Sequence, residues 1–131
     1  MTTISRLEQM VGPNRLLTQP EDLIPSSFDA TPVLNQLPLA VVFTKTVEEV
    51  IAVLKLANEI KTPIVTRGSG RGLSGSVPVP GCVVLCTVQM DQILRLDLPN
   101  LKMLVEPGVL THRWRYRPRR RVCFIRRIPV R

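Results

Sequence analysis

The chain reads Thr66-Arg67-Gly68-Ser69-Gly70-Arg71-Gly72-Leu73-Ser74-Gly75 directly after a short apolar run, and four of the last eight residues in this stretch are glycines. Glycine adopts positive φ and leaves the main chain open, so successive N–H groups can converge on an anionic oxygen. The arginines add positive charge and the serines add hydroxyl donors. Spacing alone is compatible with two interpretations, a phosphate-binding loop or a flexible turn.

A helix is predicted upstream of this glycine loop (residues 67–75), from about residue 47 to residue 61. Thr46, with Glu49 three residues later, has the pattern of a capping box. Apolar runs at residues 39–43 and 64–66 flank the helix as strands, so the unit is a strand, a helix and a parallel strand. The glycine loop then lies at the carboxyl end of a parallel strand, where open α/β sheets bind ligands. The predicted buried stripe of the helix is Val47, Val50, Ile51, Leu54, Ala57 and Ile60.

Downstream of the loop, the prolines of residues 77–80 exclude a central strand. Residues 82–87 predict a third strand. Residues 93–96 and 102–105 predict two more strands around a turn-rich connection, which favours an antiparallel hairpin. Residues 106–109 predict a loop that leaves the sheet. The predicted fold class is therefore α+β, with a βαβ unit followed by the start of a mixed or antiparallel sheet.

The N-terminal region predicts a short helix over residues 1–12, with Ile4, Leu7 and Val11 on one side. A proline-punctuated segment follows, and we expect it to be a surface connector into the fold. No apolar run reaches the length of a membrane span, and the N-terminus lacks the layout of a signal peptide. These features predict a soluble cytoplasmic protein.

Several common sites do not fit the sequence. The loop lacks the Gly-Lys-Ser/Thr ending of a P-loop, and too little helical sequence follows it for a Rossmann turn. Cys82 and Cys86 would be roughly 13 Å apart on one strand, too far for a disulfide. With one histidine and no Cys-x-x-Cys pair, we expect no metal site and idle cytosolic thiols.

The order and spacing of four segments resemble the FAD-linked oxidases with a flavin domain of the vanillyl-alcohol oxidase or p-cresol methylhydroxylase (PCMH) type. Within that family the resemblance is nearest to the D subunits of glycolate oxidases and related 2-hydroxy-acid dehydrogenases. It runs from about Phe28 to Val109. The segments are Asp29-Ala30-Thr31, Pro38 to Val42 leading into Thr46 to Val50, Pro63 to Gly75, and Val105-Glu106-Pro107-Gly108-Val109.

This resemblance implies the N-terminal part of a PCMH-type FAD-binding domain, with FAD as the cofactor. Pro107, Gly108 and Val109 resemble a second cofactor-facing turn, and the alternative for them is a tight turn that closes the sheet. The family often has threonine at the position of Arg71, so an arginine there would either crowd the loop or add a phosphate contact. The residues implied to wrap the FAD pyrophosphate are Arg67, Gly68, Ser69, Gly70, Arg71, Gly72, Leu73, Ser74 and Gly75.

The implied activity is oxidation of a 2-hydroxy acid, such as glycolate or D-lactate, to a 2-oxo acid through the flavin. Other oxidase subunits are candidate partners. The family's substrate-binding groups belong to a later domain and have no counterpart here, so we assign no catalytic residue. His112, the single histidine, lies beyond the resemblance. We expect this chain alone to bind FAD weakly at best and to be inactive.

Charge separates the last twenty residues from the rest. Residues 1–111 carry nine basic and ten acidic side chains, whereas residues 112–131 carry nine arginines and no acid, which accounts for the net charge of +8. One hypothesis is a basic arm that binds nucleic acid or an acidic partner, with the preceding domain as a non-catalytic binding module. Another is a small subunit that a partner chain completes.

The hypothesis we favour for this tail is a frameshift near codon 110. One choice of codons for residues 122–131, read two bases later, translates as Leu-Leu-Tyr-Pro-Pro-Asp-Pro-Gly, which resembles a stretch that the family carries at about that distance. The predicted organisation is an N-terminal helix and connector over 1–31, a partial FAD-binding domain over 32–110, and an out-of-frame, unstructured tail over 111–131. Nucleic acid is then not an expected partner.

Overall fold

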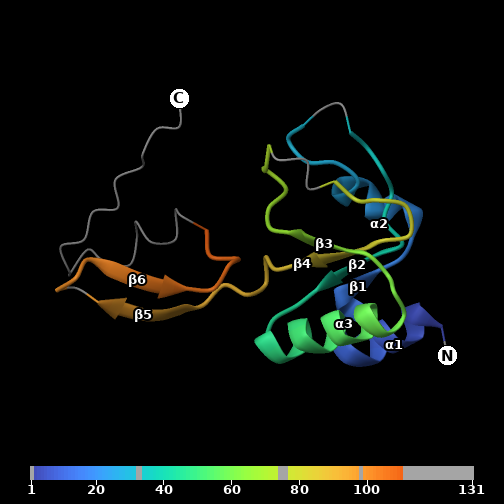
Figure 1. Ribbon diagram of the computed structural model, residues 1–131. Coiled ribbons are helices and arrows are strands. Elements are labelled where there is room, and N and C mark those ends of the chain that lie inside the picture. Colours follow the sequence, from blue (N-terminus) through green and yellow to red (C-terminus); the bar gives the residue numbers. More distant parts are fainter. Residues whose placement is uncertain (1, 32–33, 74–76, 98, 111–131) are drawn as a thin grey trace.

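The computed structural model describes residues 2–31, 34–73, 77–97 and 99–110. The predicted tail, with His112 and Cys123, lies outside the described residues, as do Ser74 and Gly75 of the glycine loop. The described part contains helices and two β-sheets, one of four strands and one of two (Figure 1). The chain is therefore α+β, as the sequence predicts.

Three parallel strands and one antiparallel edge strand make the larger sheet, in the order β1-β2-β4-β3. Strands β2 (Ala40–Phe43) and β3 (Ile64–Arg67) flank β4 (Val83–Cys86), and both run parallel to it. Strand β1 (Leu16–Leu17) pairs antiparallel with β2. The predicted strand, helix and parallel strand are present, but the strand that follows the glycine loop is inserted between the two.

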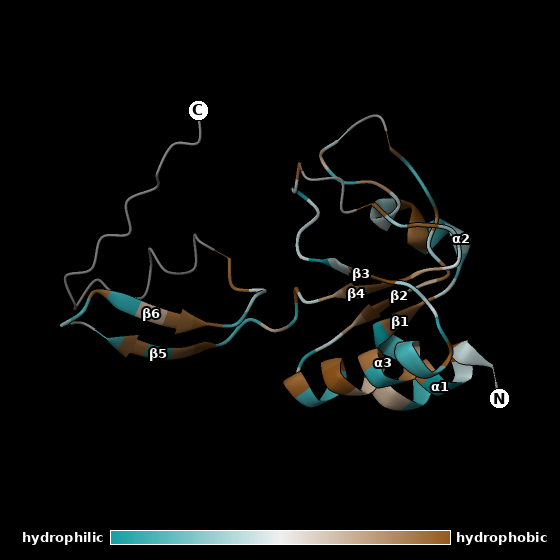
Figure 2. Ribbon diagram, viewed as in Figure 1, coloured by the Kyte–Doolittle hydropathy of each residue, from teal (hydrophilic) through white to brown (hydrophobic). Residues whose placement is uncertain are grey.

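Helices cover both faces of this sheet (Figure 1). Helices α1 (Thr3–Val11) and α3 (Val47–Glu59) pack on one face, where Leu7, Val53 and Leu56 meet the strands. On the other face, Leu23 of α2 (Pro20–Leu23) packs against Val41 and other strand residues. With both faces covered, the central strands are hydrophobic along their whole length (Figure 2).

The buried face of α3 differs from the predicted stripe. Val53 and Leu56 are the most buried residues of the helix, whereas Val47, Ile51 and Leu54 are 44–56% exposed. The prediction for these three was wrong because the helix carries apolar residues on two adjacent faces, and their spacing does not identify the face that meets the sheet. The helix start was predicted correctly, since Thr46 Oγ1 accepts the N–H of Glu49.

The segment between α1 and β2 is more structured than a surface connector. Two short 3₁₀ turns, Pro13–Arg15 and Ile24–Ser26, accompany β1 and α2 there. Ser27 and Asp29 are buried, as is Leu23. The prolines that suggested a plain connector occupy the first turns of these short helices, where a missing N–H costs nothing.

The second sheet is the predicted antiparallel hairpin, formed by β5 (Ile93–Asp97) and β6 (Lys102–Val105). Leu94 and Leu104 are more than half exposed on it. No helix in the described part of the chain is long and apolar enough to cross a bilayer. Within the same residues, no cluster of His, Cys, Asp and Glu side chains could hold a metal ion.

Candidate cofactor-binding site

The glycine loop begins where β3 ends, at the carboxyl edge of the parallel strands. The N–H of Thr87 donates to the carbonyl oxygen of Arg67 over 2.9 Å, so the ladder between β3 and β4 continues to this point. The thiol Sγ of Cys86 lies 3.9 Å from the carbonyl oxygen of Gly68. The first residues of the loop are therefore attached to the central strand of the sheet.

Beyond this attachment, the N–H groups of the loop are free. Within the residues that the structure describes, no N–H from Gly68 to Leu73 donates a hydrogen bond. A Cβ built on Gly68 or Gly72 would meet no atom of the described residues within 4 Å, so the main chain is open on that side in this part of the structure. Gly70 has a φ of +75°, which an L side chain rarely adopts. Free N–H groups beside open main chain can receive an anionic oxygen.

The guanidinium of Arg67 is turned toward the N-terminal connector. Its Nη1 donates to the carbonyl oxygen of Phe28 over 2.7 Å, and its Nη2 donates to that of Pro25 over 2.8 Å. Arg71, in contrast, is exposed and makes no hydrogen bond or ion pair within the described part of the chain. Of the two charges that the sequence assigns to the loop, only Arg71 is free of protein partners in that part.

Residues 25–30 form a bracing segment against the loop. The N–H of Ala30 donates to the carbonyl oxygen of Gly72 over 3.1 Å, which adds a third contact to the two from Arg67. The buried Asp29 turns the segment, because its Oδ1 accepts the N–H of Thr31 at 2.7 Å. Asp29-Ala30-Thr31, a segment of the family resemblance, thus lies beside the glycine loop.

The second predicted segment packs against the turn that follows β4. The N–H of Gly108 donates to the carbonyl oxygen of Met90 over 2.8 Å. A Cβ on Gly108 would lie 2.7 Å from that oxygen and would also collide with the carbonyl oxygen of Thr87. This contact accounts for glycine at position 108 by close packing, which is the tight-turn alternative. Because Thr87 contacts both Arg67 and Gly108, it joins the two predicted segments.

The thiol of Cys86 lies beneath the loop and is buried. Burial raises the pKa of Cys86, although the nearby Arg67 charge acts in the opposite direction. Burial likewise raises the pKa of Cys82. Both thiols are free and buried, as the sequence led us to expect.

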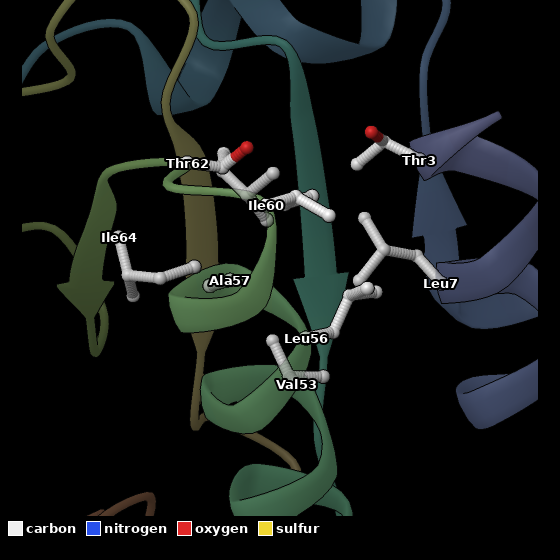
Figure 3. Close-up of a pocket in the computed structure, with 9 residues that line it drawn as sticks. Thr3, Leu7, Val53, Leu56, Ala57, Ile60, Thr62 and Ile64 are labelled. Atoms are coloured by element: carbon white, nitrogen blue, oxygen red, sulfur yellow. The ribbon is translucent and has the colours of Figure 1, made fainter.

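A separate apolar crevice lies between α1, α3 and the sheet, away from the loop (Figure 3). Its free space of about 10 Å³ is about that of one water molecule. It is lined by side chains such as Leu7, Leu56 and Ile60, so it is a small gap in the packing of the core and is too small for a cofactor.

The sequence did not identify the residues that support the loop. The loop is supported by Thr87 and by the carbonyl groups of Pro25 and Phe28. These groups act through main-chain atoms of residues that are distant in sequence. No residue type is specific to such contacts, so the sequence does not indicate them. The proline spacing at residues 25 and 32 was visible, but it does not indicate which carbonyls would accept a guanidinium.

Comparison with known proteins places the chain in a family. The profile of the FAD binding domain family matches residues 38–115, which extends past the end of the resemblance seen in the sequence and includes His112. The glycolate oxidase subunit GlcD of Bacillus subtilis (strain 168) is 37% identical over 107 residues, 81% of this chain and 23% of that protein. The flavoprotein subunit of 4-cresol dehydrogenase from Pseudomonas putida is 35% identical over 111 residues, 81% of this chain and 21% of that protein.

Among solved structures, p-cresol methylhydroxylase with substrate bound superposes with a TM-score of 0.69 at 35% identity, over 81% of this chain and 22% of that chain. The chain thus spans less than a quarter of the length of these relatives. The family match covers more than half of the chain. The chain belongs to the FAD binding domain family, the PCMH-type flavin domain of FAD-linked oxidoreductases, whose cofactor is FAD.

Proposed function

We propose that the loop formed by Arg67 to Gly75 binds the pyrophosphate of FAD. The observation that carries this proposal is the row of free N–H groups from Gly68 to Leu73 beside open main chain. A pyrophosphate supplies acceptor oxygens for such groups, and the exposed Arg71 supplies a counter-charge. The residues present therefore fit this part of the cofactor.

Pro107, Gly108 and Val109 form the second cofactor-facing turn in this proposal. Their support is position, since Thr87 links Gly108 to the start of the glycine loop. The packing of Gly108 against main-chain atoms is compatible with this role, because the turn can both close the sheet and present its outer side to the cofactor.

For an intact protein of this family that contains the present chain, the proposed reaction is oxidation of a 2-hydroxy acid. The leading candidate substrates are glycolate and D-lactate. Relatives named glycolate oxidase subunit GlcD, D-2-hydroxyglutarate dehydrogenase and probable D-lactate dehydrogenase support this substrate class. Bound flavin would supply the hydride acceptor. The chain's own contribution is to hold and orient the cofactor. Because it corresponds to 23% of the GlcD relative, we propose that it does not turn over a substrate alone.

Titration of the purified 131-residue chain with FAD and with riboflavin tests the pyrophosphate assignment. Riboflavin lacks the pyrophosphate, so we expect it to bind at least about tenfold more weakly than FAD, a difference of about 1.4 kcal/mol. Gly68→Ala should reduce FAD affinity, because the added methyl group occupies the open side of the loop while meeting no described atom within 4 Å.

Charge gives a matched pair of variants for the same titration. Arg71→Gln should weaken FAD binding, whereas Arg95→Gln removes another exposed charge, on β5, and should not. Equal affinities for FAD and riboflavin, or equal effects of the two arginine variants, would overturn the assignment. Substrate-dependent bleaching of bound flavin would overturn the proposed inactivity.

We also propose that residues 111–131 are translated out of frame. The arginine-only charge of this tail supports the proposal, because GC-rich coding DNA read out of frame yields arginine. Sequencing the encoding DNA past codon 105 and translating all three frames decides the matter. Continuation of the flavin domain in another frame is the expected result. If no frame continues it, the basic tail becomes the candidate for a binding arm, which salt-dependent nucleic-acid binding would reveal.

A further inference from the structure

We propose that Arg67 is a positioning residue, whose guanidinium shapes the glycine loop and does not contact the phosphates. The inference rests on the proposed function, since it assigns this side chain a task within the same site. It separates the two arginines of the loop, giving Arg71 the contact with the anion and Arg67 the support of the main chain.

The first observation is where the guanidinium lies. Nη1 and Nη2 each donate to a different carbonyl of the bracing segment, Phe28 at 2.7 Å and Pro25 at 2.8 Å. The planar fork of arginine suits two acceptors held in fixed positions, and hydrogen bonds from a charged donor are stronger than neutral ones. Two residues about forty positions earlier in the chain thus fix the side chain.

The second observation is that Gly70 also lies against the guanidinium of Arg67. A Cβ on Gly70 would collide with Nη2 and lie 2.5 Å from Cζ of Arg67. The main chain of Gly70 therefore lies directly against the guanidinium, and an added Cβ would require the guanidinium to move. Its φ of +75° turns the chain at the same point. The loop therefore changes direction at Gly70, where it contacts the side chain of Arg67.

The third observation is the state of the loop above this support. The N–H groups from Gly68 to Leu73 have no acceptor within the described residues, and Ala30 of the bracing segment holds the carbonyl of Gly72. A loop with unpaired donors needs an external support to keep its shape before a ligand arrives. Arg67 and the bracing segment provide it, so the free N–H groups are preorganised for an anion.

Stability of the flavin-free chain tests the contact between Arg67 and Gly70. Gly81 is a matched control because its φ is +74° and a Cβ there would meet no atom of the described part of the chain within 4 Å. Gly81→Ala should lower the folded-to-unfolded ratio by about tenfold, the cost of a left-handed backbone. Gly70→Ala should lower it further, because the methyl group also displaces the guanidinium. In an Arg67→Ala background, the two alanine variants should cost the same.

Hydrogen exchange tests the connection to the bracing segment. Arg67→Lys keeps the charge but cannot donate in a fixed fork, so it should accelerate exchange at the N–H of Ala30. Arg71→Lys is the control and should leave that exchange rate unchanged. Arg67→Lys also serves if Arg67→Ala fails to fold.

FAD binding then separates positioning from direct contact. For a positioning residue, Arg67→Lys does not restore the affinity lost in Arg67→Ala, and Gly70→Ala adds no further loss to Arg67→Ala. The inference would be overturned if Arg67→Lys restored FAD affinity, or if the affinity losses of Arg67→Ala and Gly70→Ala were additive. It would also be overturned if Gly70→Ala and Gly81→Ala destabilised the parent chain equally, or if Arg67→Lys left hydrogen exchange at Ala30 unchanged. If the parent chain binds no FAD, the proposed function fails, while the stability and exchange results still decide whether Arg67 supports the loop.

Discussion

The guanidinium of Arg15 meets the carboxylate of Glu49 with both nitrogens, Nη1 to Oε2 and Nη2 to Oε1, each at 2.7 Å. The same carboxylate accepts the N–H of Lys45 at 2.8 Å. Glu49 therefore joins the N-terminal connector to the start of α3, and both side chains are only about one-fifth exposed. The hydrogen bonds from Arg15 are the main reason that the pKa of Glu49 lies below its ordinary value of 4.5.

This pair predicts a pH dependence of stability. Because the folded-state pKa of Glu49 is depressed, its contribution is present above the unfolded pKa and is lost as the pH falls through the folded pKa. Glu49→Gln should cost about 1 to 2 kcal/mol of unfolding free energy near pH 7, and the difference should shrink below about pH 4. Urea unfolding across this range measures it.

The control for this pH prediction is Glu59→Gln, which removes a more exposed pair with Arg6. It should cost less than Glu49→Gln near neutral pH, since solvent screens an exposed ion pair. A difference between parent and Glu49→Gln that persists unchanged into acid would contradict the prediction.

Gly108 should tolerate no side chain. Gly108→Ala places a methyl group against the carbonyl oxygens of Thr87 and Met90, so the turn must move. We expect a loss of about 1 to 3 kcal/mol in thermal or urea unfolding. The methyl group of Gly68→Ala meets no atom of the described residues within 4 Å, and this variant should change stability by less than about 0.5 kcal/mol. Equal losses for the two variants would show that the turn does not pack as described.

The buried face of α3 can be tested by truncation. Leu56 is 2% exposed and Leu54 is 44% exposed on the same helix. Leu56→Ala should cost about 2 to 5 kcal/mol, whereas Leu54→Ala should stay within about 1 kcal/mol. The reverse order in urea unfolding would support the stripe predicted from the sequence.

Cys82 and Cys86 should resist alkylation in the folded chain. Both are buried, and burial raises their pKa, so the reactive thiolate is scarce at neutral pH. Iodoacetamide should modify them only after unfolding in urea, as read by tandem mass spectrometry that assigns the label to each cysteine. Modification of Cys86 in the folded chain at the unfolded rate would contradict its position beneath the loop.

Some features of this protein follow from local sequence. Thr46 and Glu49 begin the helix, the apolar runs around Val41 and Val65 form strands, and the turn between β5 and β6 closes a hairpin. These elements depend on caps, hydrophobic periodicity and turn residues within a few positions of one another. The glycine spacing likewise predicted a loop after a strand, and the family comparison supports the α+β class that the patterns indicated.

Only the tertiary structure decided which residues meet across the chain. In the structure, β4 lies between β2 and β3. Val53 and Leu56 are buried, whereas Ile51 and Leu54 are exposed. The guanidinium of Arg67 donates to the carbonyl oxygens of Pro25 and Phe28. Strand order, the buried face of a doubly apolar helix and the partner of a charged side chain depend on contacts between distant segments. A main-chain carbonyl has the same chemistry at every position, so no residue type marks the acceptors that hold the loop.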